Sequence, residues 1–149
     1  MIKNIFLLII ILLLVIFTTK KENFKNNNFY FLLKVADTYE KRKNGYMFKK
    51  TPIQKYKKHN KTYYKGILFK YDNYTNNSFW MKNTYLSLDI IFLDHNYNII
   101  DYSKNSVPLS QESIYSKKKY FYAIEIEGGL IDKLGIRIGD NIEKKIILE

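Results

Sequence analysis

The stretch from Phe79 to Asp94 constrains the fold of this chain more than any other. Alternate residues of a β-strand face opposite sides of a sheet. In this stretch, both alternating sets are largely apolar: Leu86, Leu88, Ile90 and Phe92 form one set, and Ser87, Asp89, Ile91 and Leu93 form the other. Two apolar faces predict a central strand that is covered on both sides. The same alternation continued back to Phe79 predicts that residues 79–84 are also extended.

The composition supports a fold made mainly of strands. Of the 149 residues, 17% are aromatic, and aromatic residues favour strands. We therefore expect residues 29–149 to form a single mainly β domain, a β-sandwich or a barrel-like fold, with short helices. The chain has no cysteine, which excludes disulfides, thiolate metal sites and cysteine nucleophiles.

The N-terminus is typical of a targeting segment. Residues Ile5 to Phe17 are thirteen consecutive apolar residues, which would span about 20 Å as a helix. A signal peptide has an apolar region of this length, whereas a hydrocarbon core is about 30 Å thick. No small-x-small cleavage site follows, so an uncleaved signal anchor, a transmembrane helix, is the alternative. We expect residues 1–19 to be a signal peptide or anchor, residues 20–28 a polar tether, and the domain to be secreted or membrane-anchored outside the cytoplasm.

Positive charge is concentrated in one part of this basic protein. The net charge is +11, and the window from Lys41 to Lys70 holds eleven Lys or Arg and no Asp or Glu. Such a window is either an ordinary solvated surface or a patch for an anionic partner, such as lipid head groups or a polymer. The chain contains no specific nucleic-acid motif.

Local patterns predict several smaller features. Asp37 and Glu40 fit a capping box at the start of a short helix that Gly45 ends. Residues 49–65 are basic and lack periodicity, which predicts a long exposed loop. Tyr120 to Glu127 is β-prone, and Leu130 to Leu134 is predicted to be a helical turn.

Several motifs together resemble a known family. They are Ala-Asp-Thr at 36–38, Gly-Tyr-Met at 45–47, Phe-Trp-Met-Lys-Asn-Thr at 79–84 and Leu-Gly-Ile-x-x-Gly-Asp at 134–140. With them, the chain resembles the uncharacterised domain-of-unknown-function 192 family over about residues 31–143. The resemblance implies a compact β-sandwich or barrel with small helices, often behind a signal peptide or anchor. It implies no catalytic activity, because none is established for the family.

Five polar or aromatic residues are candidates for a ligand-binding groove: Trp80, Lys82, Asn83, Asp89 and Glu125. In that interpretation, the amide and charges orient a ligand and the indole stacks against it. A structural alternative is a buried network between Lys82 and the two carboxylates. A catalytic alternative is general acid–base chemistry by two adjacent carboxylates.

The usual enzyme motifs are missing from the sequence. It has no Gly-x-Ser-x-Gly elbow, phosphate loop, dinucleotide fingerprint or His-Glu-x-x-His. We therefore assign no catalytic residue, metal or cofactor. The favoured function is non-catalytic binding of a small-molecule, polymer or protein ligand at the cell envelope. The alternatives are an envelope hydrolase using Asp89 and Glu125, and an electrostatic adaptor on anionic lipid or polymer through Lys41–Lys70.

Overall fold

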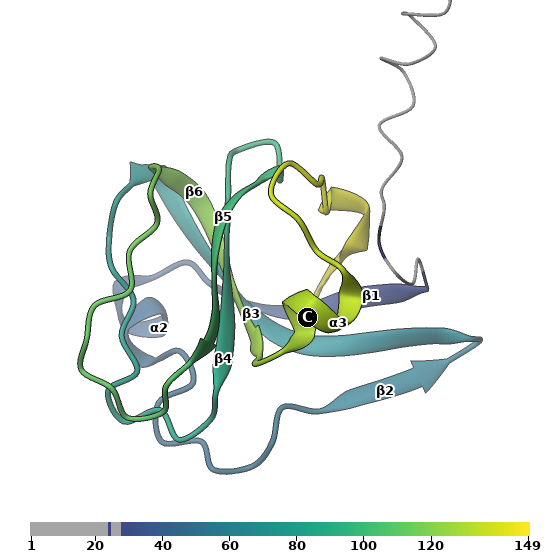
Figure 1. Cartoon of the computed structure of the whole chain (residues 1–149), viewed down its shortest axis with the longest axis horizontal. Coiled ribbons are helices and arrows are strands. Elements are labelled where there is room, and N and C mark those ends of the chain that lie inside the picture. The colour runs from purple at the N-terminus through teal and green to yellow at the C-terminus, as the bar shows by residue number, and fades with distance from the viewer. Residues whose placement is uncertain (1–23, 25–27) are drawn as a thin grey trace, which may run out of the picture.

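The fold is mainly β with short helices, as predicted. The computed structural model describes residue 24 and residues 28–149 (Figure 1). Its elements are β1 (Phe29–Ala36), α2 (Tyr39–Asn44), β2 (Lys55–Lys58), β3 (Lys61–Thr75), β4 (Leu88–Leu93), β5 (Ile99–Ser106), β6 (Tyr120–Glu127), α3 (Leu130–Leu134), the 3-10 turn η1 (Glu143–Lys145) and β7 (Ile146–Leu148).

All seven strands belong to one mixed sheet. Its order is β5-β4-β6-β3-β1-β7, with β2 paired to β3. Within residues 28–149, β5 and β7 do not pair with each other, so the sheet is open. The predicted β-sandwich or barrel is therefore corrected to one open mixed sheet. Strand β1 runs parallel to β3 and β7, and the other pairs are antiparallel. A parallel pair needs a crossover connection, and α2 and β2 lie in the connection between β1 and β3.

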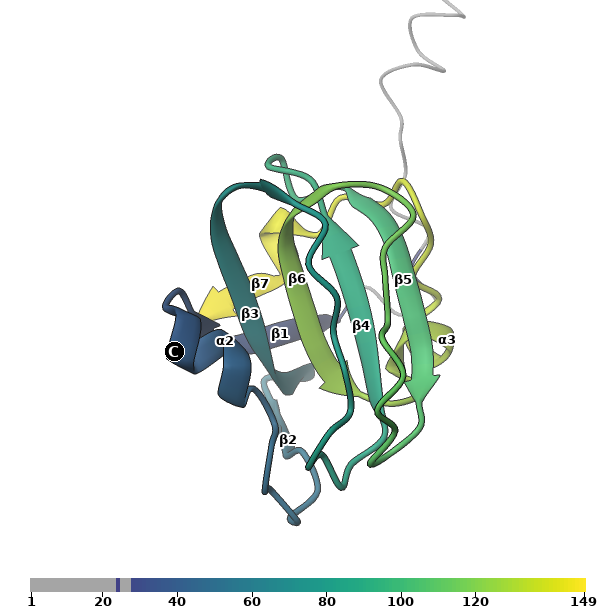
Figure 2. The ribbon, with the colours of Figure 1, turned by 90° about the vertical axis from the view of Figure 1, so that its left-hand side faces the viewer.

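Strand β4 is central and covered on both sides, as the alternation predicted. Every residue of β4 is buried. Ile91 and Leu93 pack in a core with residues of α3, whereas Ile90 and Phe92 pack in a second core with Phe79. Figure 2 shows β3, β6, β4 and β5 side by side, with long loops crossing in front of them.

The predicted strand conformation of residues 79–84 is wrong. Regular pairing begins only at Leu88, and the segment before it makes one isolated bridge, between Phe79 and Ile114. The reason is a turn: Asn83 has φ of 58°, and the N–H of Thr84 donates to the carbonyl of Met81 at 3.0 Å. Asparagine tolerates this left-handed conformation better than most residues. The segment is therefore a loop that covers one face of the sheet.

The predicted long loop over residues 49–65 is also corrected in part. Strand β2 and the start of β3 form a hairpin with Lys58 opposite Lys61. The two residues between them, His59 and Asn60, have φ of 48° and 59°, as a two-residue type I′ turn requires. Exposed lysines on both strands hide the apolar alternation by which a strand is recognised in the sequence.

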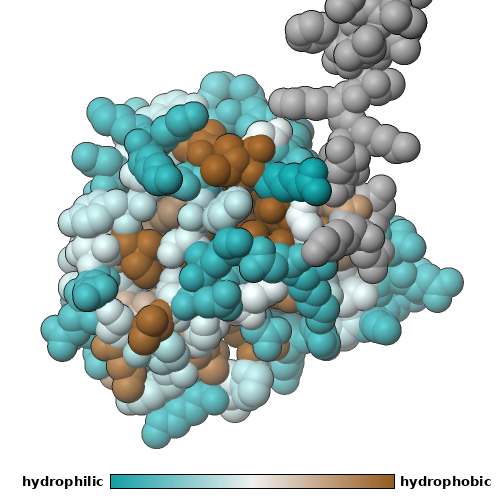
Figure 3. Space-filling model, in the orientation of Figure 1, coloured by the Kyte–Doolittle hydropathy of each residue, from teal (hydrophilic) through white to brown (hydrophobic). Residues whose placement is uncertain are grey.

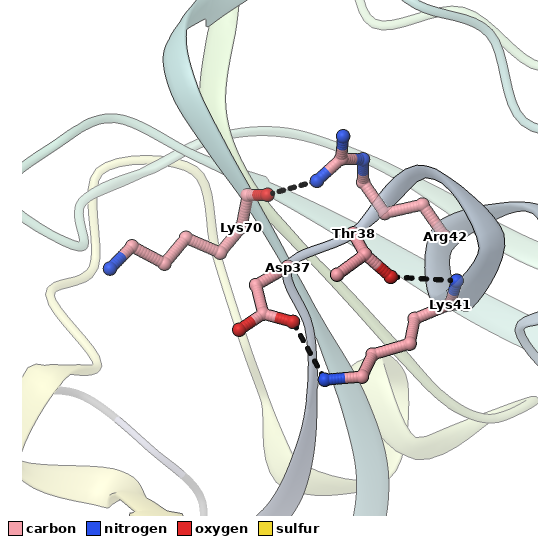
Figure 4. A network of polar contacts seen from close by, with 5 residues as sticks. All are labelled: Asp37, Thr38, Lys41, Arg42 and Lys70. Atoms are coloured by element: carbon pink, nitrogen blue, oxygen red, sulfur yellow. Dashed lines mark hydrogen bonds and ion pairs between the residues drawn. The ribbon is translucent and has the colours of Figure 1, made fainter.

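The start of α2 differs from the predicted capping box (Figure 4). The N-cap is Thr38, whose Oγ1 accepts a hydrogen bond from the N–H of Lys41 at 3.3 Å. Asp37 instead forms an ion pair with the Lys41 ammonium at 2.8 Å. The end of the helix was predicted correctly, because Gly45 follows it with φ of 42° and donates to the Lys41 carbonyl.

The N-terminal predictions lie outside the described residues, apart from Phe24 and Asn28 of the tether. In the part of the chain that the structure describes, no helix has the length and apolar character needed to span a membrane.

Candidate functional site

A pocket of about 390 Å³ lies beside α2. Four parts of the chain build it: α2 with the loop after it, β3, the segment 77–84 and β6. The lining includes Arg42, Gly45, Tyr46, Phe69, Tyr71, Asn77, Phe79, Trp80 and Glu125. Its volume falls within the range of about 300–1,000 Å³ that is usual for small-molecule sites.

The carboxyl group of Glu125 lies among the apolar walls of the pocket. The residue is only 5% exposed, and Oε2 has no hydrogen-bond partner among the described residues. Burial raises the pKa of the Glu125 carboxyl to about 8, against a smaller opposing effect of the Lys49 charge. Glu125 is therefore mostly protonated at neutral pH, and a protonated carboxyl can both donate and accept a hydrogen bond.

Gly45 allows the end of α2 to lie directly against this carboxyl. A Cβ atom at position 45 would be 3.1 Å from Glu125 Oε2 and 3.4 Å from the ring of Phe69. The positive φ of Gly45 also disfavours any other residue. This glycine thus both ends α2 and allows the backbone to approach Glu125 in the pocket.

Aromatic side chains form the walls and are held in place by one another. The rings of Phe69 and Phe79 meet edge to face with centroids 4.9 Å apart, and those of Tyr71 and Tyr120 do so at 5.5 Å. The Tyr120 hydroxyl donates to the carbonyl of Asn77 at 2.8 Å. Burial raises the pKa of both Tyr46 and Tyr71, so the phenols in the walls stay neutral.

Part of the pocket lining is aromatic and positively charged. Trp80 lines the pocket and is 46% exposed, and the Lys82 ammonium, outside the lining, lies 5.7 Å from the centroid of its ring. The Arg42 guanidinium lies over the Tyr71 ring at 4.9 Å and donates to the carbonyl of Lys70 at 2.9 Å (Figure 4). A ligand in the pocket would therefore meet a partly exposed indole and the Arg42 guanidinium, which a hydrogen bond holds in place.

The five residues proposed from the sequence do not gather at one site. Only Trp80 and Glu125 line the pocket. Lys82 is exposed, and no ion pair joins it to a carboxylate in residues 28–149. Asn83 occupies the turn, where its carbonyl accepts a hydrogen bond from the N–H of Phe48 at 2.8 Å. The proposed network between Lys82 and the two carboxylates is therefore not formed.

Asp89 lies on the other face of the sheet from Glu125. Residues directly opposite each other on paired strands share a face, and Asp89 pairs with Ile126 whereas Ile90 pairs with Glu125. The Asp89 carboxylate accepts hydrogen bonds from the N–H groups of Asn105 and Ile131, both at 2.8 Å. It therefore fastens β5 and α3 to β4. The sheet separates the two carboxylates, so they cannot form the acid–base pair of the hydrolase alternative.

Sequence reasoning missed most residues of the pocket, among them Arg42, Tyr46 and Tyr71. Arg42 and Tyr46 lie in or beside motifs that carry the family resemblance. That resemblance could have pointed to them as site residues. Nothing local distinguishes Tyr71, because this chain has fourteen tyrosines. No group of three or more His, Asp or Glu that could hold a metal ion occurs in the part of the chain that is described.

Comparison with known proteins identifies the family. The profile of domain of unknown function 192 (DUF192), described as an uncharacterized ACR, matches residues 20–144. The chain belongs to the DUF192 family. The predicted resemblance is thereby confirmed. The Phe79–Thr84 segment, a hallmark of the DUF192 resemblance, contributes Phe79, Trp80 and Thr84 to the pocket.

Two solved structures are similar to this DUF192 chain. One is a protein of unknown function from Novosphingobium aromaticivorans, with a TM-score of 0.62 and 28% identity over 73% of this chain and 71% of that one. The other is described as "a putative transcription regulator" from Sinorhizobium meliloti, with a TM-score of 0.63 and 28% identity over 73% of this chain and 78% of that one. No curated protein matches the sequence significantly.

Proposed function

We propose that this DUF192 domain binds a small, uncharged, hydroxyl- or amide-bearing ligand in the pocket beside α2, without catalysing a reaction on it. The observation that carries the proposal is the Glu125 carboxyl, which is buried in the pocket with Oε2 unpaired among the described residues. A buried polar group without a partner costs about 1–3 kcal/mol. A ligand hydroxyl or amide would recover that cost by pairing with the carboxyl.

The charges around the pocket favour an uncharged ligand over a cationic one. Arg42 and Lys43 line the pocket, and the Lys49 charge acts on Glu125. These cations would repel an ammonium group, while the protonated carboxyl offers no full negative charge to hold it. The exposed part of Trp80 supplies an apolar surface on which the apolar face of a ligand ring can pack.

The proposed location is the cell envelope. The support comes from the sequence, because residues 1–19 have the apolar character of a signal peptide or anchor and a tether follows. In this proposal the domain stands outside the cytoplasm, where small molecules or polymers of the envelope are its ligands.

Trp80 allows the proposal to be tested directly, because it is the only tryptophan of the chain and lies at the pocket. A titration with N-acetylglucosamine, which carries both hydroxyls and an amide, is expected to change its fluorescence saturably. Replacing Glu125 with alanine should weaken binding by about 1–3 kcal/mol, because a hydrogen-bond partner is lost. For Trp80→Ala, calorimetry should show that the free energy of binding is weaker by about 2 kcal/mol or more.

Two controls separate binding from folding. Trp80 is half exposed, so Trp80→Ala should melt within a few degrees of the wild type, and Trp80→Phe should keep part of the affinity. Glucosamine, which replaces the amide with an ammonium, should bind more weakly than its acetylated form. The proposal fails if neither sugar binds, or if the charged sugar binds better.

A further inference from the structure

The β2–β3 hairpin carries a second surface, independent of the pocket. It projects from the sheet in Figure 1, and its tip is hydrophilic in Figure 3. Lys55, Lys57, Lys58 and Lys61 are all exposed. No ion pair within residues 28–149 joins any of these lysines to a carboxylate. The four charges are therefore available to an external anion.

The hairpin keeps these charges together at a cost to its own stability. Lys58 lies directly opposite Lys61 across the two strands, and like charges in that position are destabilising. An ordinary solvated surface does not require that arrangement. An anionic partner would relieve the repulsion.

A row of tyrosines crosses the hairpin on the face that holds Lys58 and Lys61. Tyr56 is opposite Tyr63, and Tyr63 is opposite Tyr30 of β1. Their rings stack with centroids 4.8 Å and 5.6 Å apart, and Tyr56 remains 41% exposed. Tyrosine combines an apolar ring with a polar hydroxyl, and it is enriched where a membrane meets water.

The hairpin also lies where the chain arrives from its N-terminal segment. The N–H of Thr62 donates to the carbonyl of Asn28 at 2.8 Å, and Phe24 packs edge to face against Phe29 at 5.1 Å. The apolar run of the sequence ends at Phe17, seven residues before Phe24. Seven residues span at most about 25 Å. If that run lies in a bilayer, the hairpin is held close to the head groups.

We propose that the hairpin from Lys55 to Thr62 docks on the anionic phospholipid head groups of the membrane in which the N-terminal segment is anchored. The lysines neutralise lipid phosphates and the tyrosine row meets the interface. The domain is then held by two contacts, which fixes its orientation on the membrane.

The test places a fluorescent reporter on the hairpin of the full chain. Tyr56→Trp is combined with Trp80→Phe, and the protein is reconstituted into brominated phosphatidylcholine bilayers with or without phosphatidylglycerol. Quenching of the new tryptophan should be stronger in the anionic bilayers and should fall as salt is raised. The triple change Lys57→Gln, Lys58→Gln and Lys61→Gln should lower the docked-to-undocked ratio about a hundredfold, at about fivefold per lysine.

The matched control removes the same charge elsewhere. Lys117→Gln, Lys118→Gln and Lys119→Gln alter three exposed lysines of the loop before β6 and should leave the quenching unchanged. Equal quenching in neutral and anionic bilayers would overturn the proposal, as would an equal effect of the two triple variants. It is also overturned if the full chain does not associate with anionic bilayers.

Discussion

Replacing Glu125 with glutamine is expected to abolish a large pH dependence of stability. In the folded protein, burial raises the pKa of Glu125 from near 4.5 to about 8. Between those pH values the unfolded chain loses its proton and the folded chain keeps it, so the wild type should lose stability as pH rises. The total loss in the free energy of unfolding is about 5 kcal/mol, and it is complete above pH 8. Glutamine does not titrate and should lack this dependence.

The measurement is urea unfolding of wild type and Glu125→Gln at pH 5, 7 and 9, followed by the fluorescence of Trp80. Other titrating groups contribute equally to both proteins, so the difference between the two curves isolates Glu125. The free energy of unfolding of the variant should increase relative to that of the wild type at each higher pH. If the stabilities of the two proteins change in parallel with pH, the Glu125 carboxyl is hydrogen-bonded to a protein group or to water. That result would remove the main support for the proposed ligand.

Replacing Asp89 with alanine is expected to destabilise the fold by about 3–5 kcal/mol. The change removes the acceptor of two backbone N–H groups, that of Ile131 in a buried hydrogen bond and that of Asn105 in a partly buried one. Because Asp89 lies on the opposite face from the pocket, binding by the protein that remains folded should be unchanged. Chemical denaturation and a ligand titration measure the two effects separately.

The control for Asp89 is a carboxylate in an exposed ion pair. Asp37 pairs with Lys41 at 2.8 Å, and both side chains are at least half exposed. Asp37→Ala should therefore cost less than about 1 kcal/mol. If Asp89→Ala loses ligand affinity but no stability, Asp89 contributes to binding, and the structural role assigned to it is contradicted.

The local sequence predicted strands and turns well where one pattern dominated. The strand at Tyr120–Glu127 and the helical turn at Leu130–Leu134 have the predicted bounds. The prediction failed where side-chain type and backbone conformation disagree. Asn83 interrupts an apparently extended segment with a turn, and the β2–β3 hairpin forms in a lysine-rich segment that has no apolar alternation.

The sequence by itself determined the mainly β class of the fold, the family, the central strand β4 and two residues that line the pocket, Trp80 and Glu125. These follow from alternation, composition and motif order, which are local properties of the chain. Only the tertiary structure decided that the Phe79–Thr84 segment is a covering loop and that Asp89 is separated from Glu125. Both outcomes depend on strand register and on the turn at Asn83, since a shift of one residue moves a side chain to the other face of a sheet.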